Sequence, residues 1–213
     1  MVLMKETIPL FKVFMSPTAK DKAGEVLDSG YIGQGAKVDE FEKQIGDYFG
    51  NNKVVTTNAG TSALHLALHL LKKPKPHWNE DVFQGVAFVS HNWPGIEDGD
   101  EVLATPLTCT ASNWPIVANN LKIKWVDIDP TTLNMCLKDL EKKMTTKTKA
   151  IMGVHWGGYP LDLDKIRDIR IKFRENNGWA PALIEDGAHA FGSKYKGKYL
   201  GNHNNFVMNS LQA

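Results

Sequence analysis

The chain has 213 residues, 42% hydrophobic and 23% charged, with a formal net charge of +1. That composition suits a soluble globular protein of one large domain, or one domain plus part of another. Near-zero charge gives no electrostatic reason to expect nucleic acid or an anionic membrane surface as the main partner. No apolar run approaches the roughly 20 residues of a membrane span. Lysines interrupt the apolar pieces at the N-terminus, so no signal peptide is expected. We therefore expect a cytoplasmic protein.

The first half of the chain alternates helical and extended patterns. Residues 37–49 carry apolar side chains at helical spacing, and Gly50 follows as a stop. The β-branched run at 52–60 predicts a short strand that ends in a turn, and 61–73 predict a helix with one apolar face. The segment at about 74–97 is rich in Pro, Gly and Trp, which indicates an irregular insertion rather than a domain boundary.

The second half alternates strands with helices. The predicted strands are 101–108, 121–129, 149–158 and 181–186, and the predicted helices are 111–120, 132–144 and 162–178. This alternation indicates an α/β fold, with a mostly parallel sheet flanked by helices on both faces. Ligands of such sheets bind at the carboxyl ends of the strands. The candidate polar residues just past strand ends are Thr61, Ser62, Thr108, Cys109, His155, Asp186 and His189.

A helix start at Gly60, Thr61 and Ser62 is one candidate anion site. Free backbone N–H groups, the helix dipole and two hydroxyl groups converge there, which suits a phosphate. Ordinary N-capping explains the same residues, because Ser and Thr satisfy the free amides of a helix start. The pattern is neither a P-loop nor a GxGxxG motif, so nucleotide binding of those kinds is not indicated.

Asp186 ends the last predicted strand, and four roles are open to it: a helix N-cap, a general base, a metal ligand or the partner of a cationic cofactor. The seven histidines are scattered along the chain, which does not favour a metal site. The chain has no GxSxG motif, so a serine hydrolase is not expected. His189 alone favours a hydrogen-bonded histidine at a strand end over a catalyst. Cys109 and Cys136 have the spacing of neither a zinc site nor a disulfide framework.

Together, these features match the requirements of pyridoxal 5'-phosphate. This cofactor has a phosphate to anchor and a pyridine nitrogen that must stay protonated to act as an electron sink. A carboxylate beside that nitrogen raises the nitrogen's pKa, because it favours the charged form. A phosphate cradle at a helix start and an unpaired Asp186 on a later strand would supply both contacts.

The motifs also resemble the DegT/DnrJ/StrS family of nucleotide-sugar aminotransferases in order and spacing. The resemblance covers nearly the whole chain outside the insertion, through segments 29–50, 54–68, 99–112, 123–135, 148–166 and 184–201. It implies the large domain of the aspartate-aminotransferase-type fold and a homodimer. It also implies transfer of an amino group from glutamate to a nucleotide-linked keto sugar, in amino-sugar or surface-polysaccharide biosynthesis.

The resemblance assigns roles to particular positions. It implies that Thr61 and Ser62, beside Gly60, contact the cofactor phosphate, and that Ser210 in "NSLQA" contacts it too. It places Asp186 at the pyridine nitrogen.

Two positions depart from the pattern of the family. His189 stands near the ring hydroxyl where the family usually has Gln, and it can still donate a hydrogen bond there. Cys109 stands where the family commonly has an aromatic residue stacked on the ring. Because a thiol offers a smaller packing face, we expect ring stacking to be weaker or to come from elsewhere.

Transamination needs a lysine amine that forms a Schiff base and moves a proton. In the family this lysine follows "SxQA" by about two residues, so we expect it just beyond Ala213. Lys194, Lys196 and Lys198 lie in a polar, turn-like segment and are interpreted as solvated. The chain is therefore interpreted as the front part of a longer enzyme, inactive alone. Most of the large domain is present, incomplete at its C-terminus, and the C-terminal small domain is absent.

In the implied fold, a late strand joins the early extended run to the sheet, so its absence would leave an open edge and exposed apolar surface. Two alternatives remain. One is a sugar dehydratase of the same family, with His at the lysine position. The other is a non-catalytic module that binds a phosphate or a nucleotide sugar, against which Asp186 and Ser210 argue. The 74–97 insertion either borders the sugar-nucleotide entrance or is a surface excursion with buried Trp side chains.

Overall fold

Five of the described strands form one parallel sheet, as the sequence predicts. The structure, a computed structural model, describes residues 14–72 and 93–211. The five strands lie in the order β2-β1-β3-β4-β7, and each pair is parallel. Their bounds are β1 (Glu101–Ala104), β2 (Lys122–Trp125), β3 (Thr148–Val154), β4 (Ala182–Asp186) and β7 (Phe206–Met208). Residues 74–92, which make up most of the predicted insertion at about 74–97, lie outside the described residues.

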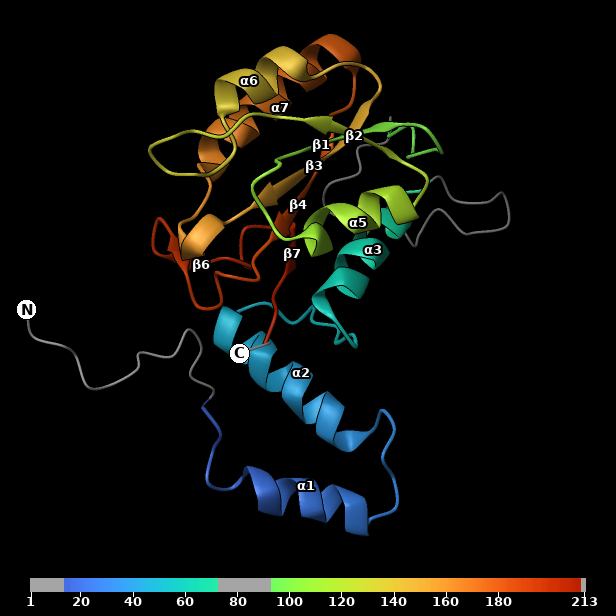
Figure 1. Cartoon of the computed structure of the whole chain (residues 1–213), viewed down its shortest axis with the longest axis vertical. Helices are drawn as coiled ribbons and strands as arrows, with labels where there is room; N and C mark the ends of the chain where they lie inside the picture. The colour runs from blue at the N-terminus through green and yellow to red at the C-terminus, as the bar shows by residue number, and fades with distance from the viewer. Residues whose placement is uncertain (1–13, 73–92, 212–213) are drawn as a thin grey trace, which may run out of the picture.

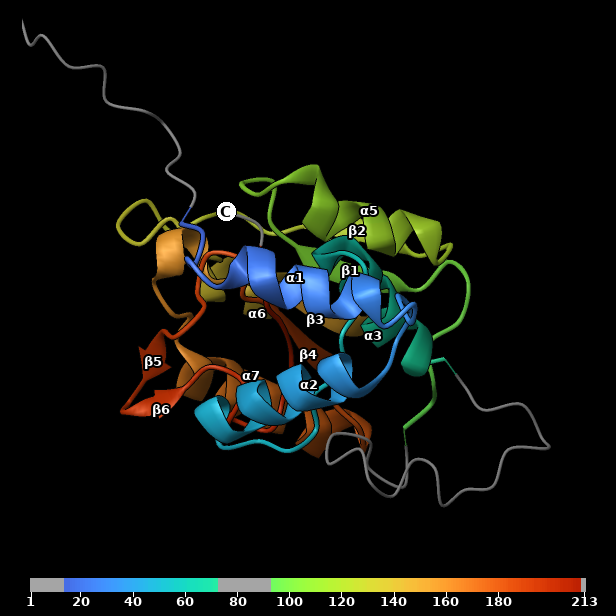
Figure 2. The ribbon, with the colours of Figure 1, turned by 90° about the horizontal axis from the view of Figure 1, so that it is seen from below.

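Helices cover both faces of the sheet (Figures 1 and 2). The α-helices of the described residues are α1 (Ala19–Asp28), α2 (Ala36–Phe49), α3 (Gly60–Leu70), α5 (Thr110–Ala118), α6 (Leu137–Lys143) and α7 (Leu163–Asn177). α3 and α5 pack side by side on one face, while α6 and α7 lie together on the other. The predicted α/β fold with a flanked parallel sheet is therefore confirmed.

Each face of the sheet has its own apolar core, because strand side chains alternate between faces. On β1, Val102 packs with Leu64 and Leu68 of α3, whereas its neighbour Leu103 packs toward α6 and α7. On β4, Ile184 joins the α3 core and Leu183 the other. This alternation decides where the next two side chains of β4 point.

The predicted strand at 52–60 is wrong, since the structure assigns no strand to these residues. Val55 is 73% exposed, and no described strand pairs with the side of β7 away from β4. Without a neighbouring strand, the run has no ladder hydrogen bonds to make. It is held instead by Glu42 of α2, whose Oε1 accepts hydrogen bonds from the backbone N–H and the hydroxyl of Thr56 at 2.7 and 2.8 Å.

The predicted helix at 132–144 is too long, because α6 begins only at Leu137. Asp129 accepts hydrogen bonds from the backbone N–H groups of Thr131 and Thr132, and Leu133 has a positive φ of 60°. An Asp side chain that bonds nearby amides competes with helix formation. A turn therefore occupies the first part of the predicted helix.

The lysine-rich segment is a small hairpin of β5 (Lys194–Tyr195) and β6 (Lys198–Tyr199). Lys196 and Gly197 at its tip both have positive φ, as a tight hairpin turn requires. The lysines at 194, 196 and 198 are exposed, which agrees with their interpretation as solvated. A short 3-10 turn, η1 (Trp156–Gly158), follows β3.

α1 and α2 form an arm that extends from the sheet (Figure 1). The predicted helix at 37–49 is confirmed as α2, and Gly50 ends it in the left-handed conformation, with φ of 70°. The end of α2 is anchored by ring contacts among Tyr48, Phe49, Phe191 and Tyr199, at centroid distances of 4.8–5.8 Å. α1 buries no side chain in the described structure.

The contact between Glu42 and Thr56 generates a pH-dependent prediction. The backbone N–H and then the hydroxyl of Thr56 hold the pKa of Glu42 below its ordinary value of 4.5. A carboxyl group with a lowered pKa stabilises the fold above its unfolded-state pKa, and that contribution is lost as the pH falls through the folded-state pKa. We expect Glu42→Gln to remove this part of the acid sensitivity, as measured by urea unfolding between pH 7 and pH 3. Glu175→Gln, on the exposed surface of α7, is the control. An unchanged pH profile in Glu42→Gln would contradict the assignment.

Candidate functional site

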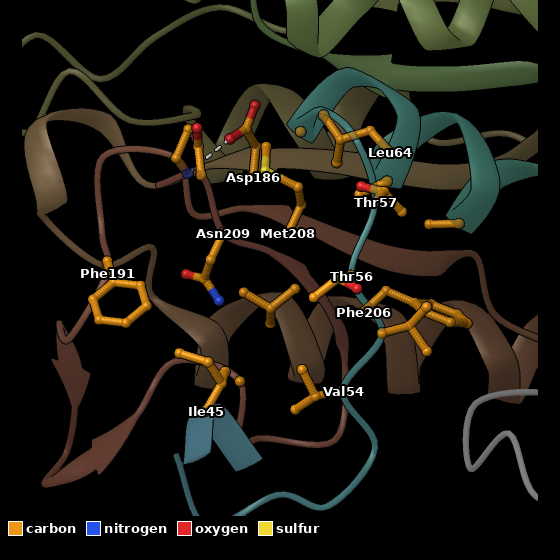
Figure 3. Close-up of a pocket in the computed structure, with 18 of the residues that line it drawn as sticks. Ile45, Val54, Thr56, Thr57, Leu64, Asp186, Phe191, Phe206, Met208 and Asn209 are labelled. Carbon is orange, nitrogen blue, oxygen red and sulfur yellow. Dashed lines mark hydrogen bonds between the residues drawn. The ribbon is translucent and has the colours of Figure 1, made fainter. Parts of the chain in front are cut away.

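A large hollow opens at the edge of the sheet, beside β7 (Figure 3). It has a volume of about 2110 Å³ and lies between α2, residues 51–59, the start of α3 and the ends of β4 and β7. We call it the β7 hollow. In Figure 3, Asp186 and Leu64 stand at one side of it and Ile45 and Val54 at the other, with Met208 and Asn209 between them. The carboxyl ends of β4 and β7 therefore face open space.

The β7 hollow brings together most of the residues predicted from the sequence. Those on its wall are Gly60, Thr61, Thr108, Cys109, Asp186, His189 and Ser210. Ser62 is half-buried and is not part of the wall. The predicted groups come from four separate connections after strands or extended segments, so their meeting follows from the parallel topology.

The start of α3 carries free donors toward this hollow. Its N-cap residue is Ala59, and no side chain caps it, so simple N-capping does not explain Thr61 and Ser62. The first amides of a helix have no partner within the helix and carry its partial positive charge. A Cβ atom on Gly60 would lie 2.8 Å from Sδ of Met208, so glycine lets the helix start approach β7 closely.

Asp186 points toward the face of α3 and α5, as the alternation along β4 requires, and its side chain is only 4% exposed. Its Oδ1 accepts the backbone N–H of Ala188 at 3.0 Å, and its Oδ2 accepts the Ser112 hydroxyl at 2.6 Å. The bond to Ala188 closes a turn rather than starting a helix, because no helix is assigned to residues 187–192. A carboxylate has about four acceptor positions, so Asp186 retains capacity for a ligand.

Glu185 points to the opposite face and belongs to a buried polar cluster. Its Oε2 lies 2.8 Å from Nε2 of His155, and its Oε1 accepts from Nδ2 of Asn205 at 2.5 Å. His155 Nδ1 accepts the backbone N–H of Leu161 at 3.0 Å, so the proton of a neutral ring is on Nε2 and is donated to Glu185. Both ring nitrogens of His155 are thus engaged, and the structure removes it from the candidates.

Burial lowers the pKa of Arg170, and the charge of Glu185 opposes that shift.

His189 and Cys109 are both exposed at the hollow. The backbone N–H of Gly157 donates to Nδ1 of His189 at 3.3 Å, which leaves Nε2 as the protonated nitrogen of a neutral ring. The Trp156 ring contacts this imidazole edge-on, at 5.3 Å between centroids. Cys109 is the N-cap residue of α5 and is a free thiol.

The structure adds two residues, Ser112 and Asn209, that no sequence pattern indicates. Ser112 is 1% exposed and contacts Asp186 directly. Its only signal is its place one helical turn after Thr108. Asn209 precedes Ser210 on the wall of the hollow, and its buried Oδ1 has no hydrogen-bond partner. An unpaired buried acceptor is rare in proteins, and no sequence pattern announces it.

The described residues contain no group of three or more His, Cys, Asp or Glu side chains that could hold a metal ion. His65 and His69 lie one turn apart on α3, so the interpretation of all seven histidines as scattered is wrong for this pair. Within residues 14–72 and 93–211, no helix has both the length and the apolar character to cross a bilayer.

The fold and the hollow define a parallel α/β domain with a free helix start and a buried carboxylate at one sheet edge. The model of the DegT/DnrJ/EryC1/StrS aminotransferase family matches residues 15–77 and 85–213. The chain belongs to this family. The resemblance inferred from its motifs is thereby confirmed.

Curated relatives include a GDP-perosamine synthase and a protein of polysaccharide biosynthesis. The chain is 35% identical over 195 residues to the GDP-perosamine synthase of Escherichia coli O157:H7, covering 91% of the chain and 46% of that protein. It is 34% identical to the spore coat polysaccharide biosynthesis protein SpsC of Bacillus subtilis, covering 83% and 38%. The chain thus spans about half the length of the curated relatives it matches.

Solved structures share the fold. AtS13 from Actinomadura melliaura is 47% identical with a TM-score of 0.84, and the match covers 97% of this chain and 49% of that one. The sugar aminotransferase CalS13 from Micromonospora echinospora is 41% identical, also with a TM-score of 0.84, covering 97% and 50%.

Two further solved structures contain the cofactor. The putative sugar aminotransferase Spr1654 from Streptococcus pneumoniae, solved in its PLP form, is 28% identical (TM-score 0.82; 98% and 50% covered). A GDP-4-keto-6-deoxymannose-3-dehydratase with a trapped PLP–glutamate geminal diamine is 25% identical (TM-score 0.74; 92% and 45% covered).

The Glu185 cluster generates a prediction about stability. Glu185→Ala leaves the buried Nε2 donor of His155 without its acceptor, which costs about 1–3 kcal/mol, and it also removes the acceptor of the half-buried Asn205. We expect a corresponding loss in the free energy of unfolding, measured with urea. Glu175→Ala on the exposed face of α7 should change it by less than about 0.5 kcal/mol. A loss in Glu185→Ala no larger than in the control would show that the cluster does not stabilise the sheet.

Proposed function

We propose that this chain is the cofactor-binding front part of a pyridoxal 5'-phosphate-dependent enzyme. The enzyme transfers an amino group from glutamate to a nucleotide-linked keto sugar. The observation that carries the proposal is that Asp186 and the free start of α3 face the same hollow. Family membership and the PLP-containing relatives support it.

The residues present fit the two polar ends of the cofactor. The first amides of α3, with the Thr61 hydroxyl and Ser210, would hold the phosphate at the wall of the hollow. The free acceptor positions of Asp186 would take the N–H of the pyridine ring. The bound cofactor supplies an electron sink for amino transfer, and the protein supplies orientation and charge.

His189 has the tautomer needed to serve the cofactor ring. Because Nδ1 accepts from Gly157, Nε2 is left to donate, and we propose that it donates to the ring hydroxyl. Cys109 at the start of α5 offers a small contact face where the family commonly stacks an aromatic ring. We therefore propose that Cys109 contributes little to stacking on the cofactor ring.

The lysine for amino transfer is proposed to lie beyond residue 213, with the rest of the large domain and the small domain. Lys194 and Lys196 are occupied elsewhere, over the Tyr199 ring and in an ion pair with Asp164, and neither lines the hollow. The relatives, about twice as long as this chain, support a longer protein.

Dehydration of a sugar is a second candidate activity, because one of the similar structures is a dehydratase. The higher sequence identity to an aminotransferase favours amino transfer. The chain is 41% identical to a sugar aminotransferase and 25% to the dehydratase. The residue that would decide between them, lysine or histidine, is expected beyond Ala213.

We also propose a homodimer in the complete protein. The arm of α1 and α2 and the outer side of α5 expose large apolar side chains away from the β7 hollow, namely Leu27, Tyr31, Ile32, Trp114 and Val117. Exposed apolar surface of this kind marks association sites.

Both described cysteines are free, which suits the proposed cytoplasmic location.

The proposal is tested by titrating the chain with pyridoxamine 5'-phosphate in a calorimeter. This form of the cofactor needs no lysine bond, so binding reports the pocket itself. We expect saturable binding that Asp186→Asn weakens at least tenfold, because a neutral amide no longer pairs with a ring cation. Asp168→Asn on the exposed side of α7 is the matched control. Equal affinity in the parent chain and Asp186→Asn, or binding of a nucleotide sugar without the cofactor, would contradict the proposal.

A further inference from the structure

Two hydroxyl groups form a hydrogen-bonded chain that ends at Asp186. The Ser112 Oγ donates to Oδ2 of Asp186 at 2.6 Å, and Oγ1 of Thr108 lies 2.6 Å from the same Ser112 Oγ. Ser112 is 1% exposed and Thr108 is half-buried. We call these two residues the hydroxyl relay.

The direction of the protons in the relay follows from the chemistry of its members. An ionised carboxylate only accepts hydrogen bonds, and a serine hydroxyl has a single proton. The proton of Ser112 therefore goes to Asp186, so the hydroxyl of Thr108 donates to Ser112. Both hydroxyl protons in the relay point toward the carboxylate.

The relay and the turn after β4 hold Asp186 at both oxygens. Oδ2 accepts from Ser112 on α5, and Oδ1 accepts the backbone N–H of Ala188. A carboxylate bonded at both oxygens cannot rotate without losing a bond. Its remaining acceptor positions are therefore kept in a fixed direction at the wall of the β7 hollow.

Capping of the helix does not account for these hydroxyls. Thr108 and Ser112 flank the start of α5, where Ser and Thr usually bond the free amides of the helix. The N-cap residue of α5 is Cys109, and it makes no side-chain cap bond. The two hydroxyls bond to each other and to Asp186 instead, although free amides are close by.

We propose that Ser112 and Thr108 are positioning residues that orient the Asp186 carboxylate toward the ring nitrogen of a cationic heteroaromatic cofactor. This inference rests on the proposed function. It adds that the β1–α5 connection, and not β4 alone, sets the geometry of the pairing. Charge-assisted hydrogen bonds are among the stronger ones in proteins, so the loss of Ser112 should be measurable in binding.

The relay is tested with the pyridoxamine 5'-phosphate titration and four variants. We expect Ser112→Ala to weaken binding about tenfold, and Ser112→Thr, which keeps the hydroxyl, to bind within about threefold of the parent. Thr108→Val should cost about two- to threefold, because it acts through Ser112. The double variant Ser112→Ala/Thr108→Val should bind no more weakly than Ser112→Ala, since the members of a serial relay are not additive.

A spectroscopic signature separates positioning from general loosening of the fold. The absorbance of the bound ligand follows protonation of its ring nitrogen. A poorly oriented Asp186 favours the protonated ring less, so the transition should move to lower pH in Ser112→Ala and stay in place in Ser112→Thr. Thr148→Val, which removes a buried hydroxyl at the start of β3 that accepts the backbone N–H of Thr145 away from the hollow, is the control.

Each outcome decides one of the two claims. Parent-like affinity and pH transition in Ser112→Ala, with binding lost in Asp186→Asn, overturn the relay and keep the cofactor site. No binding by the parent chain overturns the cofactor site, and the relay with it. Circular dichroism checks the fold of each variant. If Ser112→Ala does not fold, Thr108→Val carries the test, and its parent-like affinity and pH transition would reject the relay.

Discussion

Side chains alternate between the two faces of the sheet along β4, and this alternation positions the groups of the candidate site. Glu185 and Asp186 are adjacent, so a strand must send them to opposite faces of the sheet. Glu185 enters a buried cluster with His155 and Asn205, while Asp186 reaches the hollow beside β7. Glu185 thus links β4 to the residue after β3 and to the residue before β7. Asp186 keeps acceptor positions open at the wall of the hollow.

The contacts of Glu185 also position residues that are proposed to bind the cofactor. His155 holds the N–H of Leu161 and so fixes the loop after β3, whose Gly157 in turn sets the tautomer of His189. Asn205 ties the start of β7 to Glu185, and that strand leads to Ser210 at the wall of the hollow. The cluster of Glu185, His155 and Asn205 therefore holds in place the two segments that carry the proposed contacts to the cofactor ring and phosphate. Fully paired networks of this kind favour one arrangement of a core.

Local patterns in the sequence predicted much of this architecture and part of the site. The apolar faces of α3 and α7, and the alternation of strands with helices, are periodic signals, so the parallel sheet could be predicted. The strand expected at 52–60 could not be corrected from its own residues, because a strand depends on a partner that the described residues do not provide. Ser112 was missed because its contact with Asp186 joins residues 74 positions apart. Such contacts exist only after folding.

We propose that Asp186, at the end of β4, keeps the ring nitrogen of the bound cofactor protonated. Pyridoxamine 5'-phosphate labelled with ¹⁵N in the ring tests it most directly, because the chemical shift of that nitrogen reports its protonation. In the complex with the parent chain, we expect the nitrogen to stay protonated at a pH where the free ligand has lost the proton. A neutral nitrogen in the complex at that pH would contradict the account.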